Sequence, residues 1–225
     1  MTRTTAPPHS TPRPFDHITV VSLEHAIAAP FCTRQLADLG ARVIKVERPG
    51  DGDFARSYDQ RARGACSHFV WVNRSKESLA LDLKDPQDLA VLKKLITQAD
   101  VVVQNLAPGA AARLGLSYEA LAKVKPGFIV CDISGYGDDP AAPGPYRDKK
   151  AYDLLIQSES GFLSVTGTPD EPAKAGCSIA DISADTDVMV MATVDGSTAT
   201  APAHSTKTKI IIAAGARVMS PSTRT

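Results

Sequence analysis

The chain has 225 residues, 43% of them hydrophobic, and its 25 Lys and Arg residues balance 25 Asp and Glu residues. This length is enough for one domain with a sizeable core or for two small ones, and the zero net charge excludes an overall field that would recruit nucleic acid or a membrane surface. Cys32, Cys66, Cys131 and Cys177 are far apart and form no CxxC pair, so we expect no metal site, no disulfide scaffold and a cytoplasmic location.

Residues 18–47 give the clearest pattern in the chain, a strand followed by a helix and a second strand. Residues 18–23 (ITVVSL) are β-branched or apolar and too few for a helix. Pro30 suits the first turn of a helix, and Gly40 stands where a left-handed residue would end it. The run 41–47 (ARVIKVE) follows as the second strand. Two strands joined by a crossover helix are parallel, which predicts a sheet buried on both faces.

Such a unit often binds a dinucleotide, and the sequence permits a test of that reading. The dinucleotide fingerprint requires glycines between strand and helix, so that the pyrophosphate can approach the backbone. Here the turn reads HAIAAP, without glycine. Glu47 stands about twenty residues further on, where a ribose-binding acid is expected, but Arg48 follows it directly. A nicotinamide or flavin cofactor is therefore not favoured.

The rest of the chain repeats the alternation of strand and helix. The irregular stretch 54–69 predicts a loop, and the Gly/Pro-rich stretch 135–149 predicts a second one. The other expected elements are a strand marked by Leu79, Leu81 and Leu83, a helix starting at Asp85–Pro86, a strand at 100–106, a helix at 118–124 capped by Ser117, a strand at 128–134 and a helix at 151–161. About five strands alternating with helices predict an α/β fold, a Rossmann-like parallel sheet with crossover helices.

The two ends of the chain differ in character from this middle part. Residues 1–15 have no apolar core for a signal peptide and predict a disordered arm. Residues 186–225 are rich in Thr, Ala and Ser and predict a divergent, poorly ordered tail. Its fragments VMVMATV and KIIIAA either pair as edge strands or are loosely ordered, and disorder is favoured toward the end; IIIAAGA is too short to cross a bilayer. The folded domain is expected at residues 16–185.

Six motifs follow one another through the chain: APFCTRQLADLGARVIKVERPGDGD, NRSKESLALDLKDP, ADVVVQNLAPGAAARLGL, ISGYG, YDLLIQSESGFLSVTG and SIADI. With these motifs, residues 18–183 resemble the family III CoA-transferases, which include the formyl-CoA and carnitine CoA-transferases. One of the motifs alone would be a weak signal, but their order over most of the chain is specific. The resemblance implies the α/β fold of that family and an acyl-CoA substrate, with no permanently bound cofactor.

By this resemblance Asp181, in SIADIS, matches the nucleophile of the family. Its carboxylate would attack the acyl-CoA thioester to give an anhydride, which the CoA thiolate converts into an enzyme thioester before a second carboxylic acid takes up the CoA. Nearby helix N–H groups are expected to keep the pKa of Asp181 low, whereas Asp185, one turn further on, would tend to raise it. The alternative role for Asp181 is that of an N-terminal helix cap.

The resemblance also implies contacts to CoA from residues that follow the strands. Arg suits a bidentate phosphate contact, and Lys serves as a point charge. For each cation the alternative is a solvated surface residue. The matching positions are Ala28, Arg48, Leu81, Lys84, Asn105, Leu106, Arg113 and Lys150.

One position separates transferases from the α-methylacyl-CoA racemases of the same superfamily. The racemases are expected to pair an acid/base His with the Asp across the substrate α-carbon. Here the matching residue is Tyr152, before Asp153, and a phenol with a pKa near 10 is a poor partner for this proton transfer. Racemisation is therefore less favoured. His25 is near the expected site, but such a His is more often structural.

The chain also departs from the family. Members are roughly twice as long, form interlocked homodimers, and close a glycine-rich loop over the acyl site. The second half, this loop and the pocket of the second acid are not found here, so the fold is expected to be incomplete relative to the family. Within it, SLEHAIAAP and QSESGFLSVTG look more like members that handle small dicarboxylates such as succinate. Two functions remain open: a CoA-transferase, with succinyl-CoA as one donor, or a truncated, non-catalytic remnant that still binds CoA.

Overall fold

The computed structural model describes residues 12–125, 127–137, 144–184 and 209–213. Its centre is a six-stranded sheet in the order β3-β2-β1-β4-β5-β6, in which every neighbouring pair is parallel. The strands are β1 Thr19–Leu23, β2 Arg42–Glu47, β3 Glu77–Ala80, β4 Val101–Gln104, β5 Ile129–Ser134 and β6 Lys209–Ala213. This is the order of a doubly wound α/β sheet, in which the strand order reverses between β1 and β4. The predicted Rossmann-like parallel fold is confirmed.

Helices connect the strands, and their ends follow the predicted signals. They are α1 Ala28–Asp38, α2 Ser67–Asn73, α3 Pro86–Thr97, α4 Ala110–Arg113, α5 Tyr118–Val124 and α6 Asp153–Glu159, with 3₁₀ turns η1 Phe54–Ser57 and η2 Phe162–Val165. The Asp85 carboxylate accepts from the Gln87 N–H at 2.7 Å and caps α3. Gly40 follows α1 with φ +112°, and a Cβ there would lie 2.6 Å from an Asp16 oxygen.

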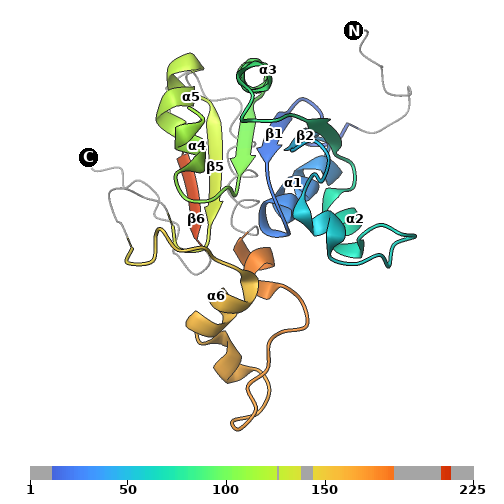
Figure 1. Ribbon diagram of the computed structural model, residues 1–225, viewed down its shortest axis with the longest axis vertical. Coiled ribbons are helices and arrows are strands. Elements are labelled where there is room, and N and C mark those ends of the chain that lie inside the picture. The colour runs from blue at the N-terminus through green and yellow to red at the C-terminus, as the bar shows by residue number, and fades with distance from the viewer. Residues whose placement is uncertain (1–11, 126, 138–143, 185–208, 214–225) are drawn as a thin grey trace.

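Helices cover both faces of the sheet. The side chains of successive strand residues point to opposite faces and pack against different helices. Val20 packs on one face with Cys32 and Leu36 of α1. Val21 packs on the other face with Leu92 of α3, in a cluster that α4 and α5 complete. Figure 1 shows α1 and α2 grouped on one side of the molecule, with α4 and α5 grouped on the other. Both faces are therefore buried, as expected of a parallel sheet.

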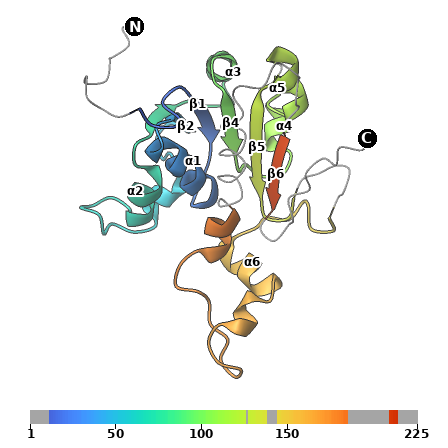
Figure 2. The same cartoon turned by 180° about the vertical axis from the view of Figure 1, so that it is seen from behind.

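Helix α6 lies apart from these layers. In Figures 1 and 2 it lies beyond the arrowheads of β4 and β5, at the carboxyl edge of the sheet, together with the segment that follows it. The chain reaches it through residues 144–152, after β5. Ligands of open parallel sheets bind at this edge, so α6 is in position to wall a site.

The prediction differs from the structure in two elements. Residues 67–73, at the end of the predicted loop and in the apolar run after it, form α2, because the Asp59 carboxylate accepts from the Ser67 N–H at 2.9 Å and Val72 is buried. Strand β3 ends at Ala80, so the alternation of Leu79, Leu81 and Leu83 continues past the paired residues. The strand itself is present where it was expected.

The ends of the chain are described only in part. Phe15, at the predicted domain boundary, packs against the α1 core, and its N–H donates to the Leu39 carbonyl at 3.0 Å. Residues 209–213 pair with β5 as a parallel edge strand, which was one of the two alternatives for that fragment. The expectations for residues 1–11, for Asp185 and for the rest of the tail lie outside the described residues.

All four cysteines are described, and none forms a disulfide. Within the described ranges, no helix has both the length and the apolar character needed to cross a membrane.

Candidate active site

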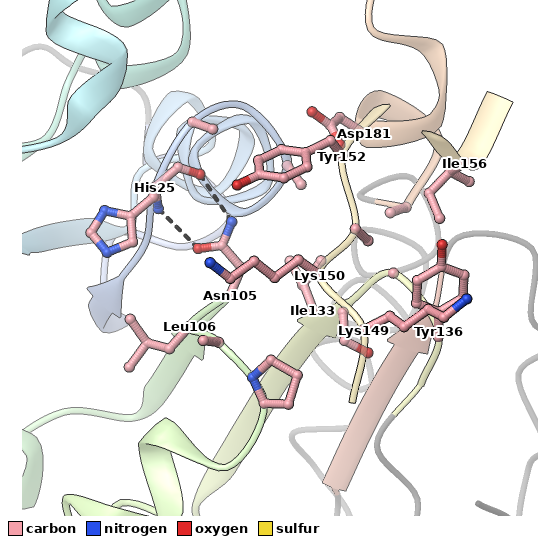
Figure 3. Close-up of a pocket in the computed structure, with 18 of the residues that line it drawn as sticks. His25, Asn105, Leu106, Ile133, Tyr136, Lys149, Lys150, Tyr152, Ile156 and Asp181 are labelled. Atoms are coloured by element: carbon pink, nitrogen blue, oxygen red, sulfur yellow. Dashed lines mark hydrogen bonds between the residues drawn. The ribbon is translucent and has the colours of Figure 1, made fainter. Parts of the chain in front are cut away.

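A cavity of about 290 Å³ opens at the carboxyl edge of the sheet. Leu23 of β1 pairs with Gln104 of β4, so the residues that follow these strands, His25 and Asn105, meet at the cavity wall. The end of β5 and the segment leading into α6 complete the wall (Figure 3). The cavity therefore lies at the reversal point of the strand order, where doubly wound sheets bind their ligands.

The turn between β1 and α1 is held in one conformation. The His25 N–H donates to the Asn105 side-chain oxygen, and the Asn105 amide donates to the His25 carbonyl, both at 2.9 Å (Figure 3). Ala26 has φ +62°, a conformation that costs a non-glycine residue free energy, and its N–H donates to Asp53 at 3.2 Å. Asn105 and Asp53 thus fix the backbone that borders the cavity.

A buried network of charges supports this turn from behind. Lys45 donates to Asp53 at 2.6 Å, and Lys76 donates to Glu24 at 2.7 Å. Thr33 donates to the other Glu24 oxygen at 2.7 Å. The side chains of Glu24, Lys45, Asp53 and Lys76 are no more than 2% exposed. Two cations and two anions balance, so each buried charge has a partner, and loss of any one would leave an uncompensated charge.

Asp181 lies in a helical turn at 179–184 and contributes to the cavity wall. Its carboxylate accepts no hydrogen bond from any described residue, whereas the N–H groups of Ala180 and Asp181 donate to Asp153, at 2.9 and 3.4 Å. The carboxylate that caps this turn is therefore that of Asp153, and the alternative of Asp181 as the cap is wrong.

The low pKa predicted for Asp181 is also wrong. Burial, and then the charge of Asp153, raise the pKa of Asp181 to about 6. The prediction failed because the helix N–H groups expected to stabilise the Asp181 anion point at Asp153 instead. Even so, a carboxyl group with a pKa of about 6 is mostly ionised at pH 7. A carboxylate without hydrogen bonds keeps its lone pairs available, which favours nucleophilic attack.

Tyr58 interacts electrostatically with Asp181, and Tyr152 lines the same cavity. Burial, the charges of Asp53 and Asp181, and Tyr152 together raise the pKa of Tyr58 to about 12, so its phenol stays protonated. Tyr152, at the position matched to the racemase His, precedes Asp153 and lines the cavity (Figure 3). His25 also lines it, but burial lowers the pKa of His25, and its Nδ1 has no hydrogen-bond partner among the described residues.

The cavity brings together five of the nine predicted site residues: Ala28, Asn105, Leu106, Lys150 and Asp181. The other four lie outside it. Arg48 follows β2, Leu81 and Lys84 follow β3, and Arg113 ends α4 after β4. Leu81 is 6% exposed, with its side chain in the core.

The four candidate cations are exposed, and each follows a different strand of the sheet in sequence. Arg48, Lys84, Arg113 and Lys150 are all exposed, and none forms an ion pair with a carboxylate in the described part of the chain. They follow β2, β3, β4 and β5, and the carboxyl ends of these strands share one edge. Cations without a carboxylate partner are suited to bind phosphate oxygens.

Two cations of the cavity were not predicted. Arg147 and Lys149 line it beside Lys150, and the Lys149 ammonium lies 3.8 Å from the ring centre of Tyr146. The basic run RDKK at the end of the Gly/Pro-rich loop is the only sequence signal for them. The cavity therefore carries more positive charge than the resemblance implied.

Glu47 is not available to a ribose. Burial opposes its ionisation, but hydrogen bonds from Arg56, the Asp53 N–H and Ser78 outweigh burial and lower the pKa of Glu47 to about 2. Its oxygens accept from Arg56 at 2.8 Å and from Ser78 at 2.9 Å. The dinucleotide reading thus loses its remaining support.

Asp59, Cys66 and His68 place possible metal ligands within 4.8 Å of one another. The Asp59 carboxylate is already engaged, because it accepts from the Ser67 hydroxyl at 2.6 Å and from the N–H groups of Ser67 and Arg61 at 2.9 Å. Its geometry is that of a helix cap for α2.

Comparison with known proteins places this geometry in a family. The pattern of CoA-transferase family III matches residues 15–196. The chain is 42% identical over 184 residues to the acetyl-CoA:oxalate CoA-transferase of Acetobacter aceti, covering 81% of this chain and 46% of that protein. It is 40% identical over 177 residues to the succinate–glutarate CoA-transferase of Agrobacterium fabrum, covering 75% and 43%.

Solved structures agree with this. A CAIB/BAIF family protein from Brucella suis superimposes with a TM-score of 0.78 at 32% identity, over 91% of this chain and 54% of the other. The chain spans less than half the length of the two relatives above. It belongs to family III of the CoA-transferases.

Proposed function

We propose that this chain transfers CoA from an acyl-CoA to a carboxylic acid, with Asp181 as the nucleophile. The observation that carries the proposal is the Asp181 carboxylate, which contributes to a cavity at the carboxyl edge of the sheet and accepts no hydrogen bond from the described residues. Its pKa of about 6 combines an ionised state at neutral pH with higher basicity than an ordinary carboxylate.

The proposed reaction has four steps that balance without an added proton. An Asp181 oxygen attacks the thioester carbonyl, the C–S bond breaks, and CoA leaves as the thiolate. The thiolate attacks the Asp181 carbonyl of the anhydride, which releases the first acid as its carboxylate and leaves an aspartyl-CoA thioester. The acceptor carboxylate then attacks the carbonyl of that thioester, the C–S bond breaks, CoA leaves again as the thiolate, and a second anhydride forms. The thiolate attacks the acceptor carbonyl and regenerates the Asp181 carboxylate.

The row of exposed cations supports the CoA part of the proposal. We assign the CoA phosphates to the cations that follow the strands and the thioester end to the cavity, which holds Lys150, Asn105 and Asp181. Cations without a carboxylate partner suit phosphate oxygens. The proposed contact residues are Ala28, Arg48, Leu81, Lys84, Asn105, Leu106, Arg113 and Lys150.

We further propose a small dicarboxylate as one substrate, with succinyl-CoA as one acyl donor. Names of the relatives include oxalate, succinate and glutarate. In this chain, Lys149 lines the cavity beside Lys150, so the cavity offers a second cation to the second carboxylate of such a substrate. Tyr152 at the position of the racemase His disfavours racemisation.

Trapping of the thioester tests the proposal. The chain is incubated with succinyl-CoA and then with hydroxylamine, which converts an aspartyl thioester into a hydroxamate that peptide mass spectrometry locates. We expect modification at Asp181, none in D181N, and unchanged modification in D170N, a matched control at an exposed Asp. Bound CoA without modification would overturn catalysis in favour of the non-catalytic CoA-binding alternative, and absence of both would overturn the proposal altogether.

The homodimer and the cytoplasmic location stay predictions. Light scattering of the purified chain tests the first: one mass at twice that of the 23.8 kDa chain is expected, and a monomer at all concentrations would contradict it.

A further inference from the structure

Helix α6 holds the segment that carries Asp181 through two side chains. The Asp153 Oδ1 accepts from the N–H groups of Ala180 and Asp181. On the next turn of α6, the Gln157 Oε1 accepts from the Ala175 N–H at 3.0 Å. The Gln157 Nε2 in turn donates to the Asp153 Oδ2 at 2.6 Å, and Gln157 is 1% exposed. Two linked side chains thus bind three N–H groups of residues 175–181.

The use of a carboxylate at position 153 disfavours ionisation of Asp181, an effect that a neutral capping residue would not have. The Asp153 carboxylate lies beside the carboxyl group of Asp181, and its charge disfavours a second anion there. A neutral Asn or Ser cap would serve a helix turn equally well. The negative charge next to the proposed nucleophile is therefore expected to affect the ionisation of Asp181 as well as the local structure.

We infer that Asp153 and Gln157 are positioning residues for Asp181: together they fix the backbone that carries the nucleophile, and they place one negative charge beside it. This inference rests on the proposed role of Asp181. Neither residue touches the reacting atoms; both act through Asp181.

The other titratable groups that face Asp181 come from three elements. Tyr58, which follows η1, interacts electrostatically with Asp181, and Tyr152, which precedes α6, lines the same cavity; both are phenols. The β1–α1 turn contributes His25, and the segment before α6 contributes the cations Arg147, Lys149 and Lys150. Of all these groups, Asp153 is the charge that raises the pKa of Asp181, after burial. Removal of the Asp153 charge is thus the perturbation that isolates the effect.

The pair permits a variant that separates charge from hydrogen bonding. In D153N, the oxygen still accepts from Ala180 and Asp181, but the new amide meets the Gln157 amide, so two donors face each other. In D153N/Q157E, the new amide at position 153 donates to one oxygen of the new carboxylate at position 157, and the other oxygen accepts from Ala175. Every hydrogen bond returns, while the negative charge moves one helical turn along α6, to the side chain that binds Ala175 rather than Asp181.

The experiment measures Asp181 in two ways. First, the chain is labelled with ¹³C at the Asp side-chain carbonyls, D181N assigns the Asp181 resonance, and its shift is titrated from pH 3 to pH 9. We expect the wild-type midpoint at about 6, a midpoint lower by about one pH unit in D153N and in D153N/Q157E, and no change in D170N. Second, the rate of Asp181 acylation by succinyl-CoA is measured at pH 8, where Asp181 is ionised in every variant. We expect D153N to lose about tenfold and the double variant to recover.

The possible failures are distinguishable. A D153N midpoint equal to that of the wild type overturns the charge effect, and a double variant no faster than D153N overturns the positioning. If D153N does not fold, the double variant, which keeps every hydrogen bond, carries the titration. If wild-type Asp181 is never acylated, the proposed function fails, while the titration, which needs no substrate, still decides the effect of Asp153.

Discussion

Replacement of Asp181 by Asn should stabilise the fold at neutral pH, and the magnitude follows from the pKa. Burial and the Asp153 charge raise the pKa of Asp181 from an ordinary 3.8 to about 6. The two values differ by about 2.2, and one pKa unit corresponds to about 1.4 kcal/mol, so ionised Asp181 costs the native state up to about 3 kcal/mol at pH 7. Asn carries no charge, and it loses no hydrogen bond, because none of the described residues donates to Asp181.

The difference in unfolding free energy between D181N and the wild type should grow as the pH rises. Below pH 3.8, Asp181 is protonated in the folded and the unfolded chain, so wild type and D181N should be equally stable. Between pH 3.8 and about 6, the unfolded chain releases its proton while the folded chain retains it, so the wild type loses stability relative to D181N as pH rises. Above about pH 6, the difference should stay constant at up to about 3 kcal/mol.

Urea unfolding of wild type, D181N and D170N at pH 4, 5, 6 and 7 measures this difference. D170N removes the same charge from an exposed loop position, and we expect it to match the wild type within about 0.5 kcal/mol at each pH. All other ionisable groups are common to wild type and D181N, so their titration cancels in the difference. A stability gain that is equal at pH 4 and pH 7, or a D181N chain less stable than the wild type at pH 7, would refute the reasoning.

Three further perturbations follow from the contacts. K150A removes an exposed cation of the cavity and should weaken CoA binding about threefold, measured by isothermal titration calorimetry; an unchanged dissociation constant would remove this residue from the site. D53N takes the partner from buried Lys45 and should cost about 3 to 5 kcal/mol of unfolding free energy, and a loss below about 1 kcal/mol would show that the ion pair is dispensable. N105A breaks both hydrogen bonds to the His25 backbone. It should lower the unfolding free energy by about 2 kcal/mol and weaken CoA binding. Unchanged stability together with unchanged CoA affinity would contradict the role of Asn105 in holding the β1–α1 turn.

The sheet could be predicted because its signals are local. The strands are short β-branched runs, and the connecting helices carry caps such as Asp85 within a few residues. The exception is α2, whose capping carboxylate, Asp59, comes eight residues before the Ser67 N–H it accepts from. A periodicity search does not register such a partner, so the first residues of α2, 67–69, fall in the predicted loop. Local patterns therefore predict which helices and strands form, whereas hydrogen bonds between distant residues determine where some of them begin.

The site could be predicted only in outline. The motif SIADI identified Asp181, but its environment depends on Asp153, which is 27 residues from Ala180 in sequence and adjacent in space. The direction of the pKa shift was therefore wrong. Likewise, Lys45 and Lys76 are buried because Glu24 and Asp53 balance their charges, and the sequence pattern does not indicate these pairings. A sequence motif indicates which residue belongs to a site, but only the folded structure shows which charged side chains lie next to each other.

The transfer of oxygen tests the central claim most directly. In the proposed reaction, the acceptor carboxylate attacks the aspartyl thioester, and the bridging oxygen of the second anhydride stays with the enzyme when the thiolate attacks the acceptor carbonyl. The chain is therefore incubated with succinyl-CoA and ¹⁸O-labelled succinate, and the Asp181 peptide is analysed by mass spectrometry. The account predicts ¹⁸O in the Asp181 carboxylate and none at Asp170. Exchange of label between succinate and succinyl-CoA with Asp181 left unlabelled would contradict it.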